Sequence, residues 1–239
     1  MKERGLAIVT GASRGIGAAI AAGLAGDGYR TVLIARGREG LERVRQGILE
    51  QDAACPEPIL LPGDITDYAA VAGELSRVCE SSGPVEVLVN SAAIFLEGSL
   101  EQPVEQFRRI MDVNVTAQYN ILQTVAAIMK KQRNGWIINI ASRAGKYGFS
   151  GGGTYSTTKF ALVGLTESLY RELAPLGIRV TALCPGWVDT DMAWESGTPL
   201  KAQEMIQPED MAKTVLYLLN LSPAVRIREI VLEVSKSII

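Results

Sequence analysis

Seven short runs of apolar, often β-branched residues alternate along this chain with longer segments whose apolar residues recur with helical period. The runs are Leu6–Thr10, Thr31–Ala35, Ile59–Leu61, Val85–Asn90, Trp136–Ile140, Arg179–Leu183 and Glu229–Val234. Strands that are apolar on both faces and alternate with helices form parallel sheets covered by helices on each side. The pattern therefore predicts an α/β fold, a doubly wound, seven-stranded parallel sheet with helices on both faces.

The segments between the runs predict the helices. Apolar residues have helical spacing in three of them, namely Ile16, Ile20 and Leu24; Leu41, Val44 and Ile48; and Val71, Leu75 and Val78. A long helix is expected from about Pro103 to Lys131, and two more begin near Tyr155 and at Pro208, a proline suited to a first turn. Because no repeat, low-complexity tract or linker interrupts the pattern, we expect one domain over residues 1–239.

The chain contains no histidine. This excludes Ser-His-Asp and Cys-His catalysis and any histidine-ligated zinc, and we expect no metal site. Proton transfer would have to come from Tyr, Lys, Asp, Glu or Cys. The formal charge is −2, from 24 Lys and Arg against 26 Asp and Glu, and no basic run stands out. A nucleic-acid partner is therefore not expected, because phosphate binding needs clustered positive charge.

The cysteines and the apolar stretches predict the cellular compartment. Cys55, Cys79 and Cys184 are odd in number, widely spaced and form no CxxC motif, which suits a reducing cytosol. Cys184 is expected to be a core residue rather than a nucleophile. The apolar stretch after Gly5 is shorter than a signal-peptide core, and no run approaches a membrane span of about 18 residues. We expect a cytoplasmic protein that makes no use of a membrane.

A glycine-rich turn follows the first predicted strand. It reads TGASRGIG from Thr10 to Gly17, and an alanine-rich helix follows at once. Glycines here permit a tight turn, close approach of a pyrophosphate and close helix packing, and the helix N-terminus offers free N–H groups to phosphate. The turn therefore predicts a dinucleotide site, with a plain structural turn as the alternative. Its predicted cofactor-binding residues are Gly11, Ser13, Arg14, Gly15, Ile16 and Gly17.

The end of the second predicted strand indicates which dinucleotide binds. A carboxylate that would hydrogen-bond the adenosine ribose is missing there, and Ala35-Arg36 takes its place. A guanidinium suits a 2′-phosphate, and Arg14 in the glycine turn would add a second charge. We therefore predict NADP(H) as the cofactor. The alternative is that Arg36 and Arg14 are solvated surface residues.

Tyr155 and Lys159 lie four residues apart, so a helix would place both on one face. A phenol with a pKa of about 10 is a poor base, but a neighbouring ammonium and an oxidised nicotinamide stabilise the phenolate. Ser142 and Asn90 stand at the carboxyl ends of predicted strands, where ligands bind in such sheets. Asn114 is a polar residue within a long apolar-faced helix, where it would mark a local bend or a buried hydrogen bond.

In this order and spacing, the motifs resemble the short-chain dehydrogenase/reductase family over nearly the whole chain. In general terms they are similar to 3-oxoacyl-acyl-carrier-protein reductases and related carbonyl reductases. The matching segments are Thr10–Gly17, Asp64, Asn90-Ser91-Ala92-Ala93, Asn114, Ser142, Tyr155 with Lys159, and Pro185-Gly186 followed by Thr190. The resemblance implies a single-domain Rossmann-type fold that binds NADP(H).

The resemblance also implies roles for individual residues. Tyr155 would give or take the proton, Lys159 would tune it and bind the nicotinamide ribose, Ser142 would polarise the carbonyl, and Asn114 would hold a relay water. Asp64 would contact the adenine. The remaining implied cofactor residues are Ile65, Asn90 and Ala92, and, lining the nicotinamide, Pro185, Gly186, Val188 and Thr190.

The predicted function is hydride transfer between NADP(H) and a carbonyl or alcohol, in a ketone or 3-oxoacyl reductase acting on a small molecule or an acyl thioester. The rivals are a non-catalytic NADP(H)-binding regulator, and an isomerase or dehydratase that consumes no net NADPH. Two departures from the family pattern are Asn-Ser-Ala-Ala for Asn-Asn-Ala-Gly, and the glycine-poor ending Glu233–Ile239. Neither removes a predicted catalytic group, but the ending leaves the substrate side and subunit packing open.

Several further side chains carry weaker predictions. Aromatic and thioether groups after the strand ends predict an apolar substrate pocket, with core packing as the alternative: Phe95, Phe149, Trp187, Met192 and Trp194. Asp189 and Asp191 are expected to be solvated or capping groups rather than metal ligands. Apolar residues beyond one buried face of two helices predict a homodimer or homotetramer: Phe107, Ile110, Met111, Phe160, Leu162 and Val163.

Overall fold

A seven-stranded sheet runs through the middle of the computed structural model, which describes residues 4–237. The strands are β1 Leu6–Thr10, β2 Arg30–Ala35, β3 Ile59–Pro62, β4 Val85–Asn90, β5 Gly135–Ile140, β6 Ile178–Pro185 and β7 Glu229–Leu232. Their order across the sheet is β3-β2-β1-β4-β5-β6-β7, and every neighbouring pair is parallel. The predicted doubly wound parallel sheet is therefore confirmed.

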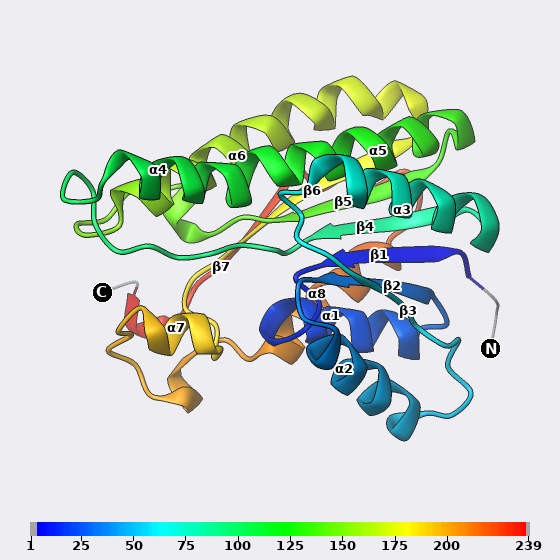
Figure 1. Cartoon of the computed structure of the whole chain (residues 1–239), viewed down its shortest axis with the longest axis horizontal. Coiled ribbons are helices and arrows are strands. Elements are labelled where there is room, and N and C mark those ends of the chain that lie inside the picture. The colour runs from blue at the N-terminus through cyan, green and yellow to red at the C-terminus, as the bar shows by residue number, and fades with distance from the viewer. Residues whose placement is uncertain (1–3, 238–239) are drawn as a thin grey trace.

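Helices cover both faces of this sheet (Figure 1). One face carries α1 Gly15–Gly26, α2 Arg38–Gln51 and α8 Pro208–Leu219. The other carries α3 Tyr68–Ser82, α5 Ala117–Gln132 and α6 Gly153–Leu173. Two short helices, α4 Val104–Met111 and α7 Asp191–Glu195, lie on either side of the edge where the strands end (Figure 1). This three-layer arrangement is a Rossmann-type fold.

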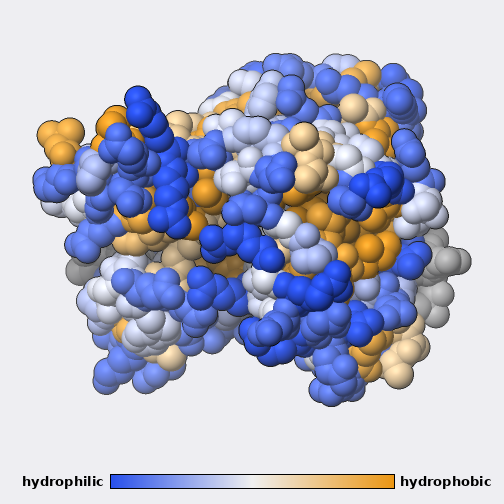
Figure 2. All heavy atoms as spheres, in the orientation of Figure 1, coloured by the Kyte–Doolittle hydropathy of each residue, from blue (hydrophilic) through white to orange (hydrophobic). Residues whose placement is uncertain are grey.

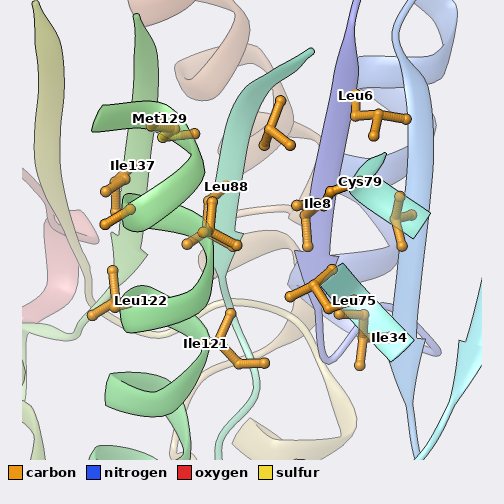
Figure 3. Packing of buried hydrophobic residues seen from close by; sticks show 14 of the residues in the cluster. Leu6, Ile8, Ile34, Leu75, Cys79, Leu88, Ile121, Leu122, Met129 and Ile137 are labelled. Atoms are coloured by element: carbon orange, nitrogen blue, oxygen red, sulfur yellow. The ribbon is translucent and has the colours of Figure 1, made fainter. Parts of the chain in front are cut away.

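The core explains why the strand ends gather at one edge. Ile8 and Leu88 on β1 and β4 are fully buried and pack toward Leu75 of α3 and Ile121 of α5 (Figure 3). The alternate residues of the same strands pack with α1 and α8 in a second cluster. A slip of one residue would exchange these two faces, so the apolar pattern holds the register. All strands are parallel, and their carboxyl ends therefore lie side by side along one edge of the sheet.

The long helix expected from Pro103 to Lys131 is not continuous. Helix α4 ends at Met111, a five-residue π-helical segment runs over Asp112–Thr116, and α5 follows. The buried amide of Asn114 lies in that segment and hydrogen-bonds the backbone of Ile94 rather than that of its own helix. Both readings of Asn114, a local bend and a buried hydrogen bond, thus apply. An inserted residue of this kind is common at functional sites.

The last strand is shorter than expected and ends at Leu232. The departing segment still packs beside the strand ends, because the Gly186 N–H donates to the Leu232 carbonyl oxygen at 2.7 Å. Two ion pairs also hold it, Arg143 with Glu233 at 3.5 Å and Lys236 with Glu204 at 2.7 Å. The atypical ending thus lies along the edge where the strands end, as far as residue 237. Residues 238–239 of that predicted segment lie outside the described residues.

The structure also shows the environment of Cys184. Cys184 is fully buried in the core, and this burial raises the pKa of its thiol to about 11, so the core reading is confirmed. Within residues 4–237 no group of three or more His, Cys, Asp or Glu side chains could hold a metal ion. Over the same residues no helix is long and apolar enough to cross a membrane.

The apolar residues invoked for assembly divide into three groups. Ile110 and Leu162 are buried in the core of their own subunit, so they cannot form an interface. Met111 and Val163 are half-buried. Phe107 and Phe160 are 37% and 46% exposed, on α4 and α6, and they are the two that best support a helix-on-helix contact.

We expect Phe160→Glu to convert an oligomer into a monomer, because the interface would then bury an unpaired carboxylate. Light scattering at micromolar concentration measures the mass of both proteins. The same change at Leu100, which is 94% exposed in the loop before α4, should leave the mass unaltered. A monomeric wild type would contradict the prediction of a homodimer or homotetramer.

Candidate active site

A cleft of about 1280 Å³ opens along the edge where the strands end. Figure 2 shows the molecule hollowed between its upper and lower halves, with hydrophobic atoms at the back of the hollow. Of the predicted site residues, all but two line this cleft: Gly11, Ser13, Arg14, Gly15, Ile16, Gly17, Arg36, Asp64, Ile65, Ala92, Ser142, Tyr155, Lys159, Pro185, Gly186, Val188 and Thr190. Residues from seven separate segments of the sequence therefore meet in one space.

The glycine turn between β1 and α1 is shaped for close backbone approach. Gly11 has a φ of +66°, and a Cβ there would lie 2.8 Å from the Ala92 Cα. A Cβ on Gly17 would lie 2.4 Å from the Gly11 carbonyl oxygen. Helix α1 starts at Gly15 with no side chain capping its first N–H groups, so they remain available to an anion at the cleft. These features fit the pyrophosphate of a dinucleotide.

Ser142, just after β5, and Tyr155, on α6, line the cleft together. The Ser142 Oγ accepts a hydrogen bond from the Ala144 N–H at 3.0 Å and lies 3.5 Å from the Pro185 carbonyl oxygen. Burial raises the pKa of Tyr155 to about 12, against a smaller lowering from its hydrogen bond with Ser142. The ring of Phe95 packs edge-on against Tyr155, with 5.3 Å between centroids. A protonated phenol and a hydroxyl thus share one point in the cleft.

Lys159 lies one helical turn beyond Tyr155, beneath its ring. Its Nζ donates to the Ile140 carbonyl oxygen at 2.9 Å and lies 5.6 Å from the centre of the Tyr155 ring. Burial lowers the pKa of this amine to about 8. Helix α6 can come this close to β5 because Gly145 has no side chain: a Cβ there would lie 2.7 Å from the Lys159 carbonyl oxygen.

Asn114 and Asn90 are the two predicted site residues that do not line the cleft; both are fully buried behind its wall. The Asn114 Nδ2 donates to the Ile94 carbonyl oxygen at 2.9 Å and to the Thr158 Oγ1 at 3.1 Å. It thereby braces the strand-end loop against α6, and its role with a relay water stays a prediction. The Asn90 Nδ2 donates to the Asn139 Oδ1 at 3.1 Å, so its side chain joins β4 to β5.

Arg36, the predicted 2′-phosphate residue, is exposed at the end of β2 and lines the cleft. Asp64 lies nearby after β3. Hydrogen bonding from the Thr66 N–H lowers the pKa of its carboxyl, and the Thr66 hydroxyl, Arg36 and Arg109 lower it further. Arg109 belongs to α4 and was not predicted from the sequence. Its place at the cleft depends on how α4 is docked, which no local motif reveals.

Arg14 lines the cleft, where its role toward a 2′-phosphate stays a prediction, and it has partners that the sequence did not predict. Its Nη1 lies 2.8 Å from the Asp191 Oδ2 and 3.7 Å from the Glu195 Oε1, both on α7. Two carboxylates thus offset the charge that was expected to approach a 2′-phosphate. Asp191 is thus solvent-exposed, as one of its two expected roles requires, and it forms an ion pair instead of capping α7. This interaction joins the glycine turn to α7 across the mouth of the cleft.

The predicted apolar wall is present with one exception. Phe95, Phe149, Trp187 and Met192 line the cleft, and Tyr147, which the sequence analysis missed, lies among them. Trp194 does not line it: the side chain is 48% exposed and its Nε1 donates to the Asp189 Oδ1 at 2.8 Å. The short helix α7 turns Trp194 away, and Asp189 thereby has a hydrogen-bond partner.

A parallel sheet whose strand ends form a glycine-walled cleft defines the class of dinucleotide-binding α/β proteins. The model of the short chain dehydrogenase family matches residues 5–201 of this chain. A 3-oxoacyl-[acyl-carrier-protein] reductase from Staphylococcus aureus is 34% identical over 227 residues, which are 91% of this chain and 92% of that protein. The chain therefore belongs to the short-chain dehydrogenase family.

Solved structures agree with this assignment. A β-ketoacyl-[ACP] reductase from Bacteroides thetaiotaomicron is 58% identical with a TM-score of 0.90, and 99% of each chain is covered. An actinorhodin polyketide ketoreductase variant, solved with NADPH, is 32% identical with a TM-score of 0.85, over 95% of this chain and 94% of that one. The family resemblance predicted from the sequence is confirmed.

Proposed function

We propose that this chain is an NADP(H)-dependent reductase of ketones or 3-oxoacyl thioesters, working as one catalytic domain over residues 1–239. The observation that carries the proposal is that Ser142, Tyr155 and Lys159 line one cleft together with the glycine turn, with the Lys159 amine 5.6 Å from the Tyr155 ring centre. The similar ketoreductase solved with NADPH supports the choice of cofactor.

The nicotinamide, when bound, supplies or accepts the hydride. On the protein side, the Ser142 hydroxyl donates a hydrogen bond to the substrate carbonyl oxygen and fixes it beside the Tyr155 hydroxyl. Tyr155 then donates its proton to that oxygen as the alkoxide develops. The positive charge of protonated Lys159 stabilises the phenolate left behind. In the reverse direction the same groups remove the proton from an alcohol.

A non-catalytic NADP(H)-binding regulator is the second candidate. Such a protein needs the glycine turn and Arg36 but has no use for a proton donor in the cleft. Ser142, Tyr155 and Lys159 all line the cleft, which favours the enzyme.

One experiment separates the reductase from the non-catalytic regulator and from the isomerase or dehydratase. NADPH oxidation is followed at 340 nm against a panel of ketones, quinones and acyl thioesters. Net oxidation with at least one carbonyl is the expected result, and none with any member would refute the proposal.

The walls of the substrate end predict a preference among these carbonyls. Phe95, Phe149, Trp187 and Met192 present apolar surface in the same cleft as the Ser142 hydroxyl. Burial of apolar substrate surface stabilises binding by about 25 cal/mol per Å², so alkyl, aryl and long-chain acyl carbonyls should have the higher kcat/KM. Steady-state kinetics on a matched series of 2-ketones and 2-oxoacids measures this. Efficient turnover of a small 2-oxoacid, with none of an alkyl or aryl ketone, would contradict the prediction.

A further inference from the structure

The segment that follows β7 packs behind the wall of the cleft next to Ser142. The Ser142 Oγ lies 3.5 Å from the Pro185 carbonyl oxygen. The neighbouring Gly186 N–H donates to the Leu232 carbonyl oxygen at 2.7 Å, and a Cβ on Gly186 would lie 3.9 Å from the Glu233 Cα. Glu233 therefore packs against the same short segment that contacts the serine proposed to hold the substrate carbonyl.

Glu233 also forms an ion pair with a side chain of the cleft itself. Arg143 directly follows Ser142 in the sequence and lines the cleft. The Arg143 Nη1 lies 3.5 Å from the Glu233 Oε1, and both side chains are 34% exposed. Water and salt screen a partly buried pair less than an exposed one. The Glu233 carboxylate thus offsets the charge of Arg143 at a place where a substrate would meet that charge.

The remaining charges near the proposed catalytic serine are negative. Two segments flank this serine, residues 140–149 and 185–196, and both belong to the part of the chain that the structure describes. Their charged residues that line the cleft are one cation and two carboxylates: Arg143, Asp189 and Asp191. A carboxylate on a substrate would therefore meet two like charges in these walls, and one opposite charge that Glu233 already offsets.

We propose that Glu233 is a specificity-determining residue: by offsetting the charge of Arg143, it selects carbonyl substrates that carry no carboxylate close to the reacting carbon. This inference rests on the proposed reductase function and narrows its substrates to neutral ketones, oxoesters and thioesters. A 2-oxoacid would be repelled by Glu233 and would compete with it for Arg143. Glu233 belongs to the glycine-poor ending, so the selection comes from a part of the chain that departs from the family pattern.

The same ion pair would have the opposite effect if Arg143 bound a substrate carboxylate and Glu233 only oriented the guanidinium group. Loss of the Glu233 charge would then weaken the binding of anionic substrates. In the proposed role, loss of this charge favours anionic substrates, because the cleft becomes more positive by one unit. The two roles therefore predict opposite signs for the result of one substitution.

The test is Glu233→Gln, which keeps the shape of the side chain and removes its negative charge. The measurement is kcat/KM for two substrates with the same carbon skeleton, an oxoester that the wild type reduces and its free acid, such as methyl benzoylformate and benzoylformate. We expect the ratio of kcat/KM for the acid to that for the ester to rise about two- to fivefold, the factor that a partly exposed charge pair contributes.

Glu229→Gln is the matched control, because it removes the same charge four residues earlier. The partner of Glu229 is Lys146, whose Nζ lies 2.9 Å from the Glu229 Oε2 and which lines a separate small pocket beside α6. The ratio should keep its wild-type value in this variant. A double variant, Arg143→Gln with Glu233→Gln, should lose the rise, because the cation that attracts the acid is then absent.

The outcomes separate this inference from the proposed function. A higher ratio in Glu233→Gln, with no rise in Glu229→Gln or in the double variant, supports the inference. An unchanged or lower ratio in Glu233→Gln would overturn it and leave the reductase activity standing, and so would an equal rise in either of the other variants. A wild type that reduces no carbonyl of the panel would refute the proposed function, and the inference with it. Near-ultraviolet circular dichroism verifies that each variant is folded.

Discussion

Tyr155→Phe should lower kcat for carbonyl reduction by a factor of about 10² to 10⁴, the usual contribution of a positioned general acid. The change removes only the hydroxyl. The ring that packs against Phe95 and lies over Lys159 is retained, so the shape of the cleft and the affinity for NADPH should hardly change. A pKa near 12 means that the phenol carries its proton at neutral pH, ready for donation in the reductive direction.

Stopped-flow or steady-state kinetics with the best ketone of the panel gives kcat for the wild type and the variant. A fluorescence titration gives their affinity for NADPH. Tyr147→Phe is the matched control, since Tyr147 lines the same cleft but is 68% exposed. The Tyr147→Phe variant also loses a phenolic hydroxyl, and its kcat should equal that of the wild type. If Tyr155→Phe retains more than about a tenth of the wild-type kcat, tyrosine is not the proton donor.

The second large effect concerns the cofactor. We expect the wild type to use NADPH with a kcat/KM about one to two decades above that for NADH, because charge-assisted hydrogen bonds contribute about 1.5–3 kcal/mol. Two arginines would have given more, but Arg14 already pairs with Asp191 and Glu195. Arg36→Asp should reverse the preference, since it removes an attraction and adds a repulsion.

Steady-state kinetics with both cofactors at fixed ionic strength measures this reversal. Arg38→Asp makes the same charge change two residues later, on a side chain outside the cleft that lies 3.9 Å from the Glu42 carboxylate, and should shift the preference far less. Equal kcat/KM for NADH and NADPH in the wild type would show that Arg36 is a solvated surface residue that does not bind the 2′-phosphate.

Local patterns were enough for the parts of the site that lie within one strand, turn or helix. The glycine turn and the spacing of Tyr155 and Lys159 each depend on a few consecutive residues, so their geometry follows from the sequence. The alternation of strands and helices likewise predicted the sheet, because burial on both faces leaves few other arrangements. Strand boundaries shifted by one or two residues, as hydrogen bonding at the ends of strands depends on neighbours.

Long-range contacts limited the rest of the prediction. The ion pair of Arg14 was not predicted because its partner Asp191 stands 177 residues away in the sequence. Arg109 was missed because the rotation of α4 about its axis decides whether it or Arg108 lines the cleft. Asn114 interrupts its helix because it bonds to Ile94, on a loop that the helical pattern does not contain. In each case the determining partner comes from another segment of the chain.

The close packing at Gly145 limits which substitutions the sequence can accept at this position. A single methyl group there would push against the backbone oxygen of Lys159, 2.7 Å away, and would have to displace α6 from the sheet. Tyr155 and Lys159 would move together with that helix, away from Ser142, which lies just after β5. A misplacement of about 1 Å between reacting groups can cost a hundredfold in rate. Selection for catalytic activity therefore also constrains Gly145, although Gly145 contacts no reacting atom. A survey of tolerated substitutions should find Gly145 as intolerant of change as Tyr155.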